Sequence, residues 1–446
     1  MEEDTALLLD LYELTMADAY LAEGMEASAT FSLFVRVLPP QRNYLLAAGL
    51  EDALDYLESL RFGSAALEWL DSRGLFSRRL LDWMERFRFT GDVDAMPEGT
   101  PVFAEEPLLE VTAPLPMAQL VETVLINQVH LQTMAASKAS RVVQAAAGRP
   151  VVDFGLRRMH GIDAGMKVAR AAFIAGVTGT SNVAAGWRYG IPLSGTLAHS
   201  YVQAHEDEDE AFRAFTRRYP EATLLVDTYD TLRGVRRVVR LAQAQRESFH
   251  VRAMRLDSGD LLTLSREARR ILDDAGLTRI QLVASGGLDE DSVARLVASD
   301  APINAFGVGT AMGVSKDAPA LDMAYKLVTY ADRDRTKLSA AKVLHPGRKQ
   351  VFRREEDGSA KHDTLTRRGH EAAGRPLLRP VMRAGKRLPE TSPPLPHIQA
   401  HARHEVATLP PRLLELTPAS PPYRVNVAPE LAQALARLEA DWAAAP

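Results

Sequence analysis

The chain has 446 residues, of which 46% are hydrophobic and 25% charged, and its formal net charge is −5. This composition is typical of a globular protein with a large core, and the acidic balance argues against a general nucleic-acid-binding protein, which usually carries a basic domain. The sequence has no cysteine, which excludes disulfides, a thiolate nucleophile and cysteine-ligated zinc.

The N-terminus does not have the pattern of an export signal. It begins with acidic residues and lacks a basic region followed by an apolar core. No apolar run approaches the roughly 18 residues that a membrane-spanning helix needs. We therefore expect a soluble, cytoplasmic protein with no membrane partner.

The first 148 residues predict a mixture of helices and short strands. Apolar residues recur at helical spacing in residues 10–23, 47–60, 65–87 and 117–147. The β-branched and aromatic run at residues 29–40 ends in two prolines and predicts a strand. Residues 89–112, which glycine and prolines interrupt, predict further strands and turns.

After Pro150 the sequence changes to a regular alternation. Seven short apolar segments end in small or polar residues, each followed by a helical stretch: VVDFG, GVTGTSN, PLSGTLAH, TLLVDTYD, VRAMRLDSGD, IQLVASGG and INAFGVGT. This alternation predicts βα units and a parallel sheet. Polar endings on all seven segments favour a closed barrel with its site at the strand C-terminal ends. An open, doubly wound sheet, the competing architecture, would concentrate its site at one switch point.

Beyond His345 the proline content rises, most clearly in residues 388–396. This part is more typical of an extended wrapping segment than of a third compact domain. It ends in a predicted helix at residues 429–443.

Two glycine turns follow the last two predicted strands, at Ser285-Gly286-Gly287 and at Gly307-Val308-Gly309-Thr310. Glycines between a strand and a helix let backbone N–H groups approach an anion at the helix N-terminus. Two such turns on neighbouring late strands predict a phosphate site, which barrels often build there. The alternative is that the glycines only allow tight turns.

Arg255 and Asp257 form a second candidate group at the end of the segment that begins at Val251. The arginine could pair with phosphate or carboxylate, and the aspartate with ribose hydroxyls or a metal. The alternative is a helix cap. We expect Asp260 to be the cap of the helix that begins at Leu261, and Asp257 to be the functional carboxylate.

His199 ends another segment, among small residues, where it could act as a nucleophile or proton carrier. It needs an orienting partner on its other ring nitrogen, and Asp227, at the end of the next segment, could supply one. The alternative is a structural histidine.

Phe154 and Arg157 could stack on a flat ring and pair with an acid, although a buried phenylalanine and a surface salt bridge are the alternative. The acidic run at residues 206–210 could suggest a metal. However, acids at the start of a predicted helix fit the helix dipole and a solvated face. We therefore expect no metal site built from protein side chains.

Ten segments spread over nearly the whole chain together resemble the nicotinate phosphoribosyltransferase family, one of the type II phosphoribosyltransferases, which also include the nicotinamide and quinolinate enzymes. The segments are DLYELTMADAYLAEG, FVRVLPPQRNYLLAAGL, FGLRRMHGIDAG, GTSNVAAG, SGTLAHSYVQAH, YPEATLLVDTYDT, RLDSGDL, VASGGLDE, FGVGTAM and KLSAAKVLHPGRKQVFR. Each is a weak signal, but all ten in order are highly specific.

The resemblance implies an irregular α/β barrel of the seven-stranded type and an α+β sandwich domain formed by N-terminal and C-terminal segments. The implied domains are residues 1–148, 149–345 and 346–446, the last returning to the N-terminal domain and the dimer surface. It also implies a homodimer in which Tyr12 of one subunit completes the other's active site.

The resemblance further implies that the chain forms nicotinate mononucleotide and pyrophosphate from nicotinate and 5-phosphoribosyl 1-pyrophosphate (PRPP), in NAD biosynthesis, with Mg²⁺ and with ATP as a co-substrate. The pyridine ring would lie between Tyr12 and Phe154, with Arg157 near the base and sugar phosphate. Thr196 would be a further nicotinate contact. The nicotinamide enzyme carries a carboxylate at the position of Ser181, so serine favours the acid over the amide.

By the same likeness, ATP phosphorylates His199, with Asp227 as its partner, and the phosphohistidine couples ATP hydrolysis to tighter substrate binding. Arg255 and Asp257 resemble the contacts to base and ribose. The residues that resemble the 5′-phosphate cradle are Ser285, Gly286, Gly287, Gly309 and Thr310.

Three other interpretations stay open. The nicotinamide enzyme shares the fold, and assays with both bases separate the two. A phosphate-binding barrel without catalysis is the second, although the intact set of His199, Asp227, Arg255 and Asp257 argues against it. An aldolase-like barrel is the third, but it would need a Schiff-base lysine at a strand end, and none of the seven segments ends in lysine.

Overall fold

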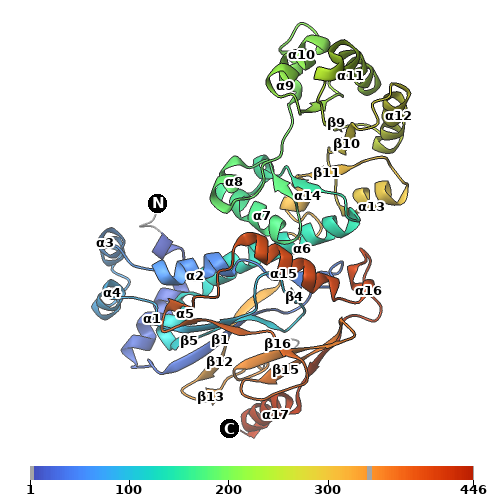
Figure 1. Cartoon of the computed structure of the whole chain (residues 1–446). Coiled ribbons are helices and arrows are strands. Elements are labelled where there is room, and N and C mark those ends of the chain that lie inside the picture. The colour runs from blue at the N-terminus through green and yellow to red at the C-terminus, as the bar shows by residue number, and fades with distance from the viewer. Residues whose placement is uncertain (1–4, 339–343, 445–446) are drawn as a thin grey trace. The chain divides into compact units, whose positions relative to one another are not determined.

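The computed structural model describes residues 5–338 and 344–444, and the chain divides into two compact units (Figure 1). The terminal unit combines Met1–Ser137 with Ala320–Pro446, and the barrel unit is Lys138–Pro319. Residues 339–343, within the last of the ten family segments, lie outside the described residues.

The terminal unit is built on a seven-stranded sheet of chain-distant segments. Its strands, in spatial order, are β13 (Arg333–Asp334), β12 (Met323–Tyr330), β1 (Ser28–Val35), β5 (Pro107–Pro114), β3 (Asp92–Ala95), β17 (Arg379–Arg383) and β18 (Lys386–Arg387). β1 pairs antiparallel with β5 on one side and with β12 on the other. Because β12, β17 and β18 come from the C-terminal part of the chain, the predicted α+β domain formed jointly by both ends is confirmed.

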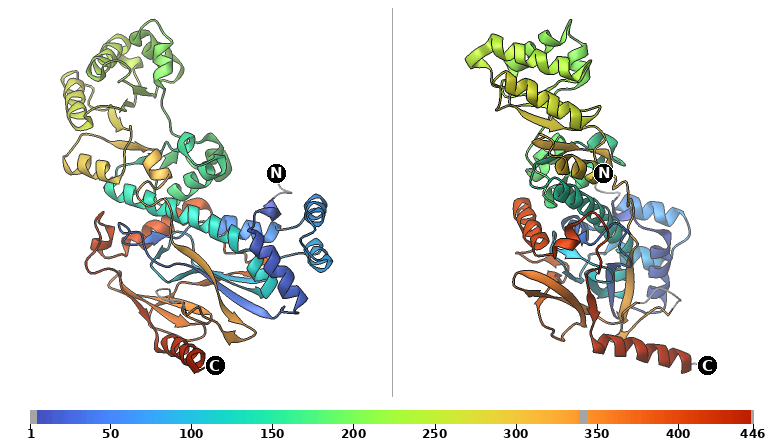
Figure 2. Two further views of the ribbon diagram at one scale, coloured as in Figure 1. Left: turned by 180° about the vertical axis from the view of Figure 1, so that it is seen from behind. Right: turned by 90° about the vertical axis from the view of Figure 1, so that its right-hand side faces the viewer.

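Two smaller sheets complete this unit. They are a four-stranded sheet of β16 (Arg375–Pro376), β14 (Lys349–Glu356), β15 (Ser359–Arg367) and β19 (Val425–Val427), and the pair β2 (Leu45–Leu46) and β4 (Pro101–Val102). The helices are α1 (Leu11–Ala22), α2 (Leu50–Ser59), α3 (Ser64–Ser72), α4 (Arg78–Glu85), α5 (Leu115–Leu120), α15 (Leu395–Ala407), α16 (Pro411–Leu414) and α17 (Pro429–Ala444). Near the C-terminus, α17 packs against β15 (Figure 2).

One predicted helix is interrupted by glycine. The single helix expected over residues 65–87 is wrong, because α3 and α4 are separate helices. Gly74 lies between them with φ +65°, a left-handed conformation that ends a helix. The helix expected over residues 117–147 is likewise divided at Val121 into α5 and α6 (Glu122–Ala145), which continues into the barrel unit.

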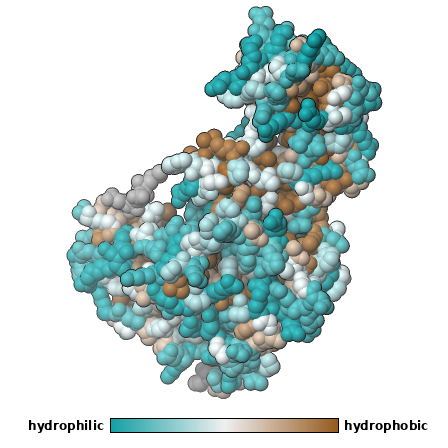
Figure 3. Space-filling model, viewed as in Figure 1, coloured by the Kyte–Doolittle hydropathy of each residue, from teal (hydrophilic) through white to brown (hydrophobic). Residues whose placement is uncertain are grey.

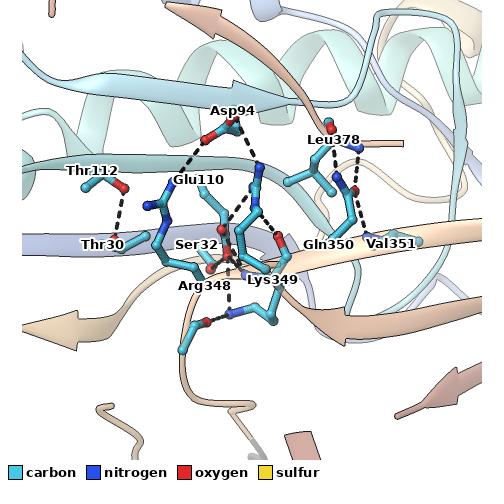
Figure 4. A network of polar contacts seen from close by, with 12 residues as sticks. Thr30, Ser32, Asp94, Glu110, Thr112, Arg348, Lys349, Gln350, Val351 and Leu378 are labelled. Carbon is cyan, nitrogen blue, oxygen red and sulfur yellow. Dashed lines mark hydrogen bonds and ion pairs between the residues drawn. The ribbon is translucent and has the colours of Figure 1, made fainter. Parts of the chain in front are cut away.

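Buried charges hold the returning chain against the first sheet. Asp94 on β3 and Glu110 on β5 are 2% and 1% exposed. Arg348 and Arg383 lie 3.4 and 2.8 Å from the Asp94 carboxylate. The Lys349 ammonium lies 3.4 Å from Glu110, and Figure 4 shows Arg348 and Lys349 beside these two carboxylates. A buried carboxylate is costly unless such partners neutralise it, so the C-terminal chain is an integral part of this unit.

A buried carboxyl on α1 predicts a pH dependence of stability. Glu13 is fully buried, and burial raises its pKa from 4.5 to about 7, although hydrogen bonds from Thr123 oppose the shift. The folded chain therefore binds this proton more tightly than the unfolded chain. The stabilisation is complete below pH 4.5 and is lost as the pH rises through about 7.

We expect the free energy of unfolding of the wild type, relative to Glu13→Gln, to fall by about 2 kcal/mol between pH 5 and pH 8. Urea denaturation at both pH values measures this difference. Glu23→Gln, which changes an exposed carboxylate at the other end of α1, should follow the wild type. A constant difference between wild type and Glu13→Gln across this range would contradict the assignment.

The barrel unit contains a six-stranded parallel sheet. In spatial order its strands are β7 (Gly179–Thr180), β6 (Val151–Asp153), β11 (Ala305–Val308), β10 (Gln281–Ala284), β9 (Ala253–Leu256) and β8 (Thr223–Leu225). Residues of this sheet such as Leu224, Met254 and Phe306 are fully buried, as expected for a parallel sheet covered by helices. The helices are α7 (Ile162–Ile174), α8 (Val183–Tyr189), α9 (His199–Gln203), α10 (Glu208–Arg218), α11 (Thr231–Gln245), α12 (Leu261–Asp274), α13 (Glu290–Ala298) and α14 (Thr310–Gly313).

The strand predicted at residues 192–199, the third of the seven segments, is reduced to a single bridge. Leu193 forms one parallel bridge with Thr180 at the β7 edge, and within residues 138–319 no strand pairing joins this segment to β8. Pro192 lacks an N–H and Gly195 disfavours extended structure, which explains why the segment does not form a strand. The predicted α/β barrel is therefore confirmed as a curled parallel sheet, closed less completely than expected.

Across the described parts of the chain, no helix has both the length and the apolar character that crossing a bilayer would require.

Candidate functional site

A cavity of about 750 Å³ lies at the C-terminal ends of the barrel strands. Residues that follow β6, β7, β9, β10 and β11 line it, together with residues 193–199 of the third predicted segment. Twelve of the fourteen residues proposed from the sequence lie on its wall; the exceptions are Asp227 and Tyr12. The strand ends converge because the strands of a parallel barrel all point the same way.

The glycine turn after β10 is shaped by close packing. Gly286 has φ +92°, and a Cβ there would lie 1.7 Å from the backbone oxygen of Asp257. Gly287 has φ +70° and open space around it. The amides of Gly286 and Gly287 have no acceptor within residues 138–319. This turn therefore presents free N–H groups at the cavity wall, which suits an anion.

The second glycine turn precedes α14. A Cβ on Gly309 would lie 2.9 Å from the backbone oxygen of Phe154, and one on Gly307 would lie 2.3 Å from the Phe154 ring. Thr310, the first residue of α14, is exposed on the cavity wall. Here the glycines make room for Phe154, and Gly307 and Gly309 also line the cavity.

Asp257 lies at the centre of the polar groups. Its Oδ1 accepts a hydrogen bond from the Ser285 hydroxyl at 2.5 Å. Its Oδ2 lies 3.8 Å from Arg255 Nη2 and 3.9 Å from His199 Nε2. One carboxylate thus joins the glycine turn, a guanidinium and an imidazole.

The imidazole of His199 has a different partner from the one expected. Its Nδ1 lies 3.2 Å from the Thr228 hydroxyl, and the ring is part-exposed at the start of α9. Asp227 instead accepts from the Asp257 amide at 3.0 Å and from the Ser258 hydroxyl at 2.6 Å. Successive side chains at a strand end point to opposite sides, so Asp227 reaches the neighbouring β9 loop while Thr228 faces the histidine.

Arg255 retains unused hydrogen-bonding capacity. Burial lowers its pKa, and the Asp257 carboxylate opposes that shift. Its guanidinium carbon lies 6.0 Å from the centre of the Phe154 ring, and its buried Nε has no partner among the described residues. An arginine in this position can bind an anion next to an aromatic face.

The remaining predicted contacts occupy the cavity rim. Arg157 and Ser181 are exposed, and the Thr196 hydroxyl donates to the Leu197 carbonyl at 3.0 Å. Tyr12 belongs to α1 of the terminal unit and is 43% exposed. Burial of part of its ring and the nearby Glu122 raise its pKa.

Sequence reasoning missed two supporting residues. Thr228 directly follows Asp227 in its strand-end segment, and the rule that polar strand ends face the site could have found it. The buried Asp153 ends β6, where its carboxylate accepts from the Gly155 amide at 2.8 Å and the Thr180 hydroxyl at 2.7 Å. Burial raises the pKa of Asp153. This residue fixes the turn that carries Phe154.

The acidic run at the start of α10 is only partly solvated. Asp207 caps the helix by accepting from the Glu210 amide at 2.8 Å. The expectation of a fully solvated face is wrong for Glu208, which is 3% exposed and lies 3.2 Å from Arg237. Among the described residues, no three His, Asp or Glu side chains are grouped as metal ligands.

The fold and cavity define a class: an α/β barrel with a glycine turn, an imidazole and a carboxylate at its strand ends. A family model described as the nicotinate phosphoribosyltransferase (NAPRTase) N-terminal domain matches residues 7–130, and the model of the nicotinate phosphoribosyltransferase (NAPRTase) family matches residues 150–334. The chain belongs to the nicotinate phosphoribosyltransferase family.

Individual relatives agree with this assignment. A nicotinate phosphoribosyltransferase of Mycobacterium tuberculosis is 53% identical over 433 residues, which cover 97% of this chain and 94% of the relative. One from Bacillus subtilis is 42% identical over 360 residues, covering 79% and 74%. The crystal structure of human nicotinic acid phosphoribosyltransferase matches with a TM-score of 0.86 at 27% identity, covering 96% of this chain and 99% of that chain.

Proposed function

We propose that this chain transfers the phosphoribosyl group of PRPP to nicotinate, as a step of NAD biosynthesis, with ATP hydrolysis coupled through a phosphohistidine at His199. Membership of the family supports the transfer reaction. The observation that supports the site is the position of Asp257 beside His199, Arg255 and the glycine turn at Ser285. An imidazole, a guanidinium and a glycine turn placed around one carboxylate suit both phosphoryl transfer and phosphoribosyl transfer.

Nicotinate would bind against the face of Phe154. Arg255, next to that ring and with an unpartnered Nε, would pair with the nicotinate carboxylate through charge-assisted hydrogen bonds. Ser181 adds no negative charge to the cavity wall, which favours an acid over an amide. Arg157 and Thr196, on the same wall, would complete the contacts to base and sugar phosphate.

In the transfer step the pyridine nitrogen attacks the anomeric carbon while the bond to pyrophosphate breaks. The transition state has oxocarbenium character, and the negative charge of Asp257 would stabilise it. The amides of Gly286 and Gly287 would hold the 5′-phosphate. The pyridine nitrogen carries no proton to remove, so positioning and charge stabilisation account for most of the rate.

The Asp257 carboxylate on the cavity wall fits Mg²⁺, and Asp227 adds a second negative charge behind it. Oδ1 of Asp227 is buried without a partner among the described residues, and Asp257 lies on the adjacent loop. Mg²⁺ is commonly held by one or two carboxylates together with substrate phosphate oxygens. Asp257 would hold the ion together with substrate phosphate oxygens, and the ion would offset the charge on the departing pyrophosphate.

In the ATP step a ring nitrogen of His199 attacks the γ-phosphorus, and ADP leaves as the N–P bond forms. Thr228, bonded to Nδ1, would fix the ring orientation. Water later cleaves the N–P bond and releases phosphate. Because phosphorylation adds negative charge beside Asp257, it changes the electrostatic field at the sugar site, which supports a coupling between ATP hydrolysis and substrate binding.

Exposed apolar side chains near the cavity support a homodimer. Trp187 is 88% exposed and Ile162 83%, and Val183 and Leu193 are also exposed. Figure 3 shows apolar surface over α8. Such exposed patches mark interaction surfaces, and a second copy of the chain would cover this one and supply Tyr12 of the partner subunit. Light scattering measures whether the particle has the mass of two chains.

The direct test is incubation with nicotinate, PRPP and Mg²⁺, with and without ATP, while the mononucleotide is followed. We expect nicotinate mononucleotide to form, faster with ATP, and nicotinamide to react poorly. A preference for nicotinamide, or no product with either base, would reject the proposal.

Ser181 supplies a prediction about base selectivity. Ser181→Asp should raise the KM for nicotinate at least tenfold, because a second carboxylate on the cavity wall repels the substrate's charge. Ser181→Asn introduces a side chain of nearly the same shape as aspartate but without its charge. This variant should raise the KM for nicotinate much less. Equal effects of the two variants would assign the change to size and remove Ser181 from the selectivity argument.

A further inference from the structure

We infer that Ser285 is a positioning residue, whose hydroxyl holds Asp257 for the reaction and does not bind the 5′-phosphate. The inference deepens the proposed function and rests on it. Ser285 is 2% exposed, and its Oγ lies 2.5 Å from Asp257 Oδ1. Its amide donates to the Leu256 carbonyl at 2.9 Å, so the backbone that directs this hydroxyl is itself fixed.

The number of protons decides between the two roles. A serine hydroxyl has one proton to donate, and an ionised carboxylate can only accept. The Ser285 proton is therefore used in the bond to Asp257. Only lone pairs remain on Oγ. They cannot form a hydrogen bond with a phosphate oxygen, because that oxygen is also an acceptor. The free amides of Gly286 and Gly287 are the donors that this turn directs to an anion.

Asp257 is held from several sides. Asp227 accepts from its backbone amide at 3.0 Å, and Gly286 packs so closely on its carbonyl that only glycine fits. Ser285 is the remaining restraint and fixes the carboxylate rotation. That rotation leaves Oδ2 3.8 Å from Arg255 and 3.9 Å from His199. Without the hydroxyl, the carboxylate could turn and pair with Arg255 alone.

Ser285→Ala is the test. We expect kcat for nicotinate mononucleotide formation to fall about tenfold or more, the usual consequence of losing a hydrogen bond to a charged group. The affinity for inorganic phosphate, titrated by ³¹P NMR, should change less than twofold, because the glycine amides remain. The ¹⁵N signals of the His199 ring should shift in the resting enzyme, since the carboxylate near it has moved.

Two further variants separate positioning from folding. Ser265→Ala removes another fully buried hydroxyl of the barrel unit, one that donates to the Leu262 carbonyl on α12, and it should change none of these readouts. Ser285→Cys keeps a donor at this position, although a weaker one on a larger atom, and should give an intermediate kcat. It replaces the alanine variant if that variant does not fold.

The outcomes are distinct. A fivefold or larger loss of phosphate affinity in Ser285→Ala would assign the hydroxyl to the phosphate and overturn the inference. An unchanged kcat with unchanged His199 signals would overturn it as well. If the wild type makes no mononucleotide but the His199 signals shift in Ser285→Ala only, the proposed function fails and the positioning role stands.

Discussion

Replacing His199 with alanine is expected to abolish ATP hydrolysis, with a loss of about a thousandfold or more, while slow ATP-independent phosphoribosyl transfer survives. The reason is chemical: the substitution removes the nitrogen that would accept the phosphoryl group and leaves Arg255, Asp257 and the glycine turn in place. The KM for PRPP should also rise, because tight binding depends on the phosphoenzyme.

Steady-state assays of ADP release and of mononucleotide formation measure the two activities separately. His205→Ala is the matched control: His205 lies just beyond α9, its Nδ1 is 2.8 Å from the Tyr201 carbonyl, and it does not line the cavity. Acid-labile labelling from γ-³²P-ATP should appear in the wild type and in His205→Ala only. Retention of half the ATPase activity in His199→Ala would reject the phosphohistidine.

Gly286→Ala is expected to lower kcat/KM for PRPP about a hundredfold or more and to lower the melting temperature. A Cβ at Gly286 would lie 1.7 Å from the Asp257 backbone oxygen, so the two loops must separate. The positive φ adds about 1 kcal/mol of strain for any L-residue. Separation of these loops displaces the anion-binding amides and the carboxylate together.

Gly276→Ala isolates the strain. Gly276 also has a positive φ, +73°, but no atom lies within 4 Å of its Cβ position, and it follows α12 at the opposite end of β10 from the cavity. In Gly276→Ala, backbone strain should lower the stability by a similar amount, and the activity should not change. If both variants lost activity equally, global destabilisation would explain the result, and the close approach of the two loops would have no functional meaning.

Much of the site could be predicted from strand ends alone. Phe154, Asp257 and Ser285 each follow a short apolar strand and Arg255 lies near the end of one, and parallel strands place such residues at one edge. The structure places all four on one cavity wall. The same rule placed Asp227 near the site, but it could not choose between Asp227 and Thr228 as the partner of His199, because adjacent residues differ only in the direction of their side chains.

Other differences trace to local backbone chemistry. Helix α3 ends just before Gly74, although the apolar spacing continues past it. Periodicity did not reveal this end, because it shows which face of a helix is buried and not whether each residue has a helical φ. The third segment, at residues 192–199, was predicted to be a strand, yet Pro192 and Gly195 limited it to one bridge. Glu208 appeared solvated as part of an acidic run, although the position of Arg237 on the next helix allows it to be buried.

The family, the succession of βα units and the chemical groups at each strand end can be read from residue order, because they depend on motifs and on short-range periodicity. Which groups meet depends on the folded chain: Ser285 with Asp257, Thr228 with His199, and Asp227 with the loop after β9. Hydrogen bonds depend on differences of a few tenths of an ångström between loops far apart in the chain, and such distances are set by packing and not by spacing along the sequence.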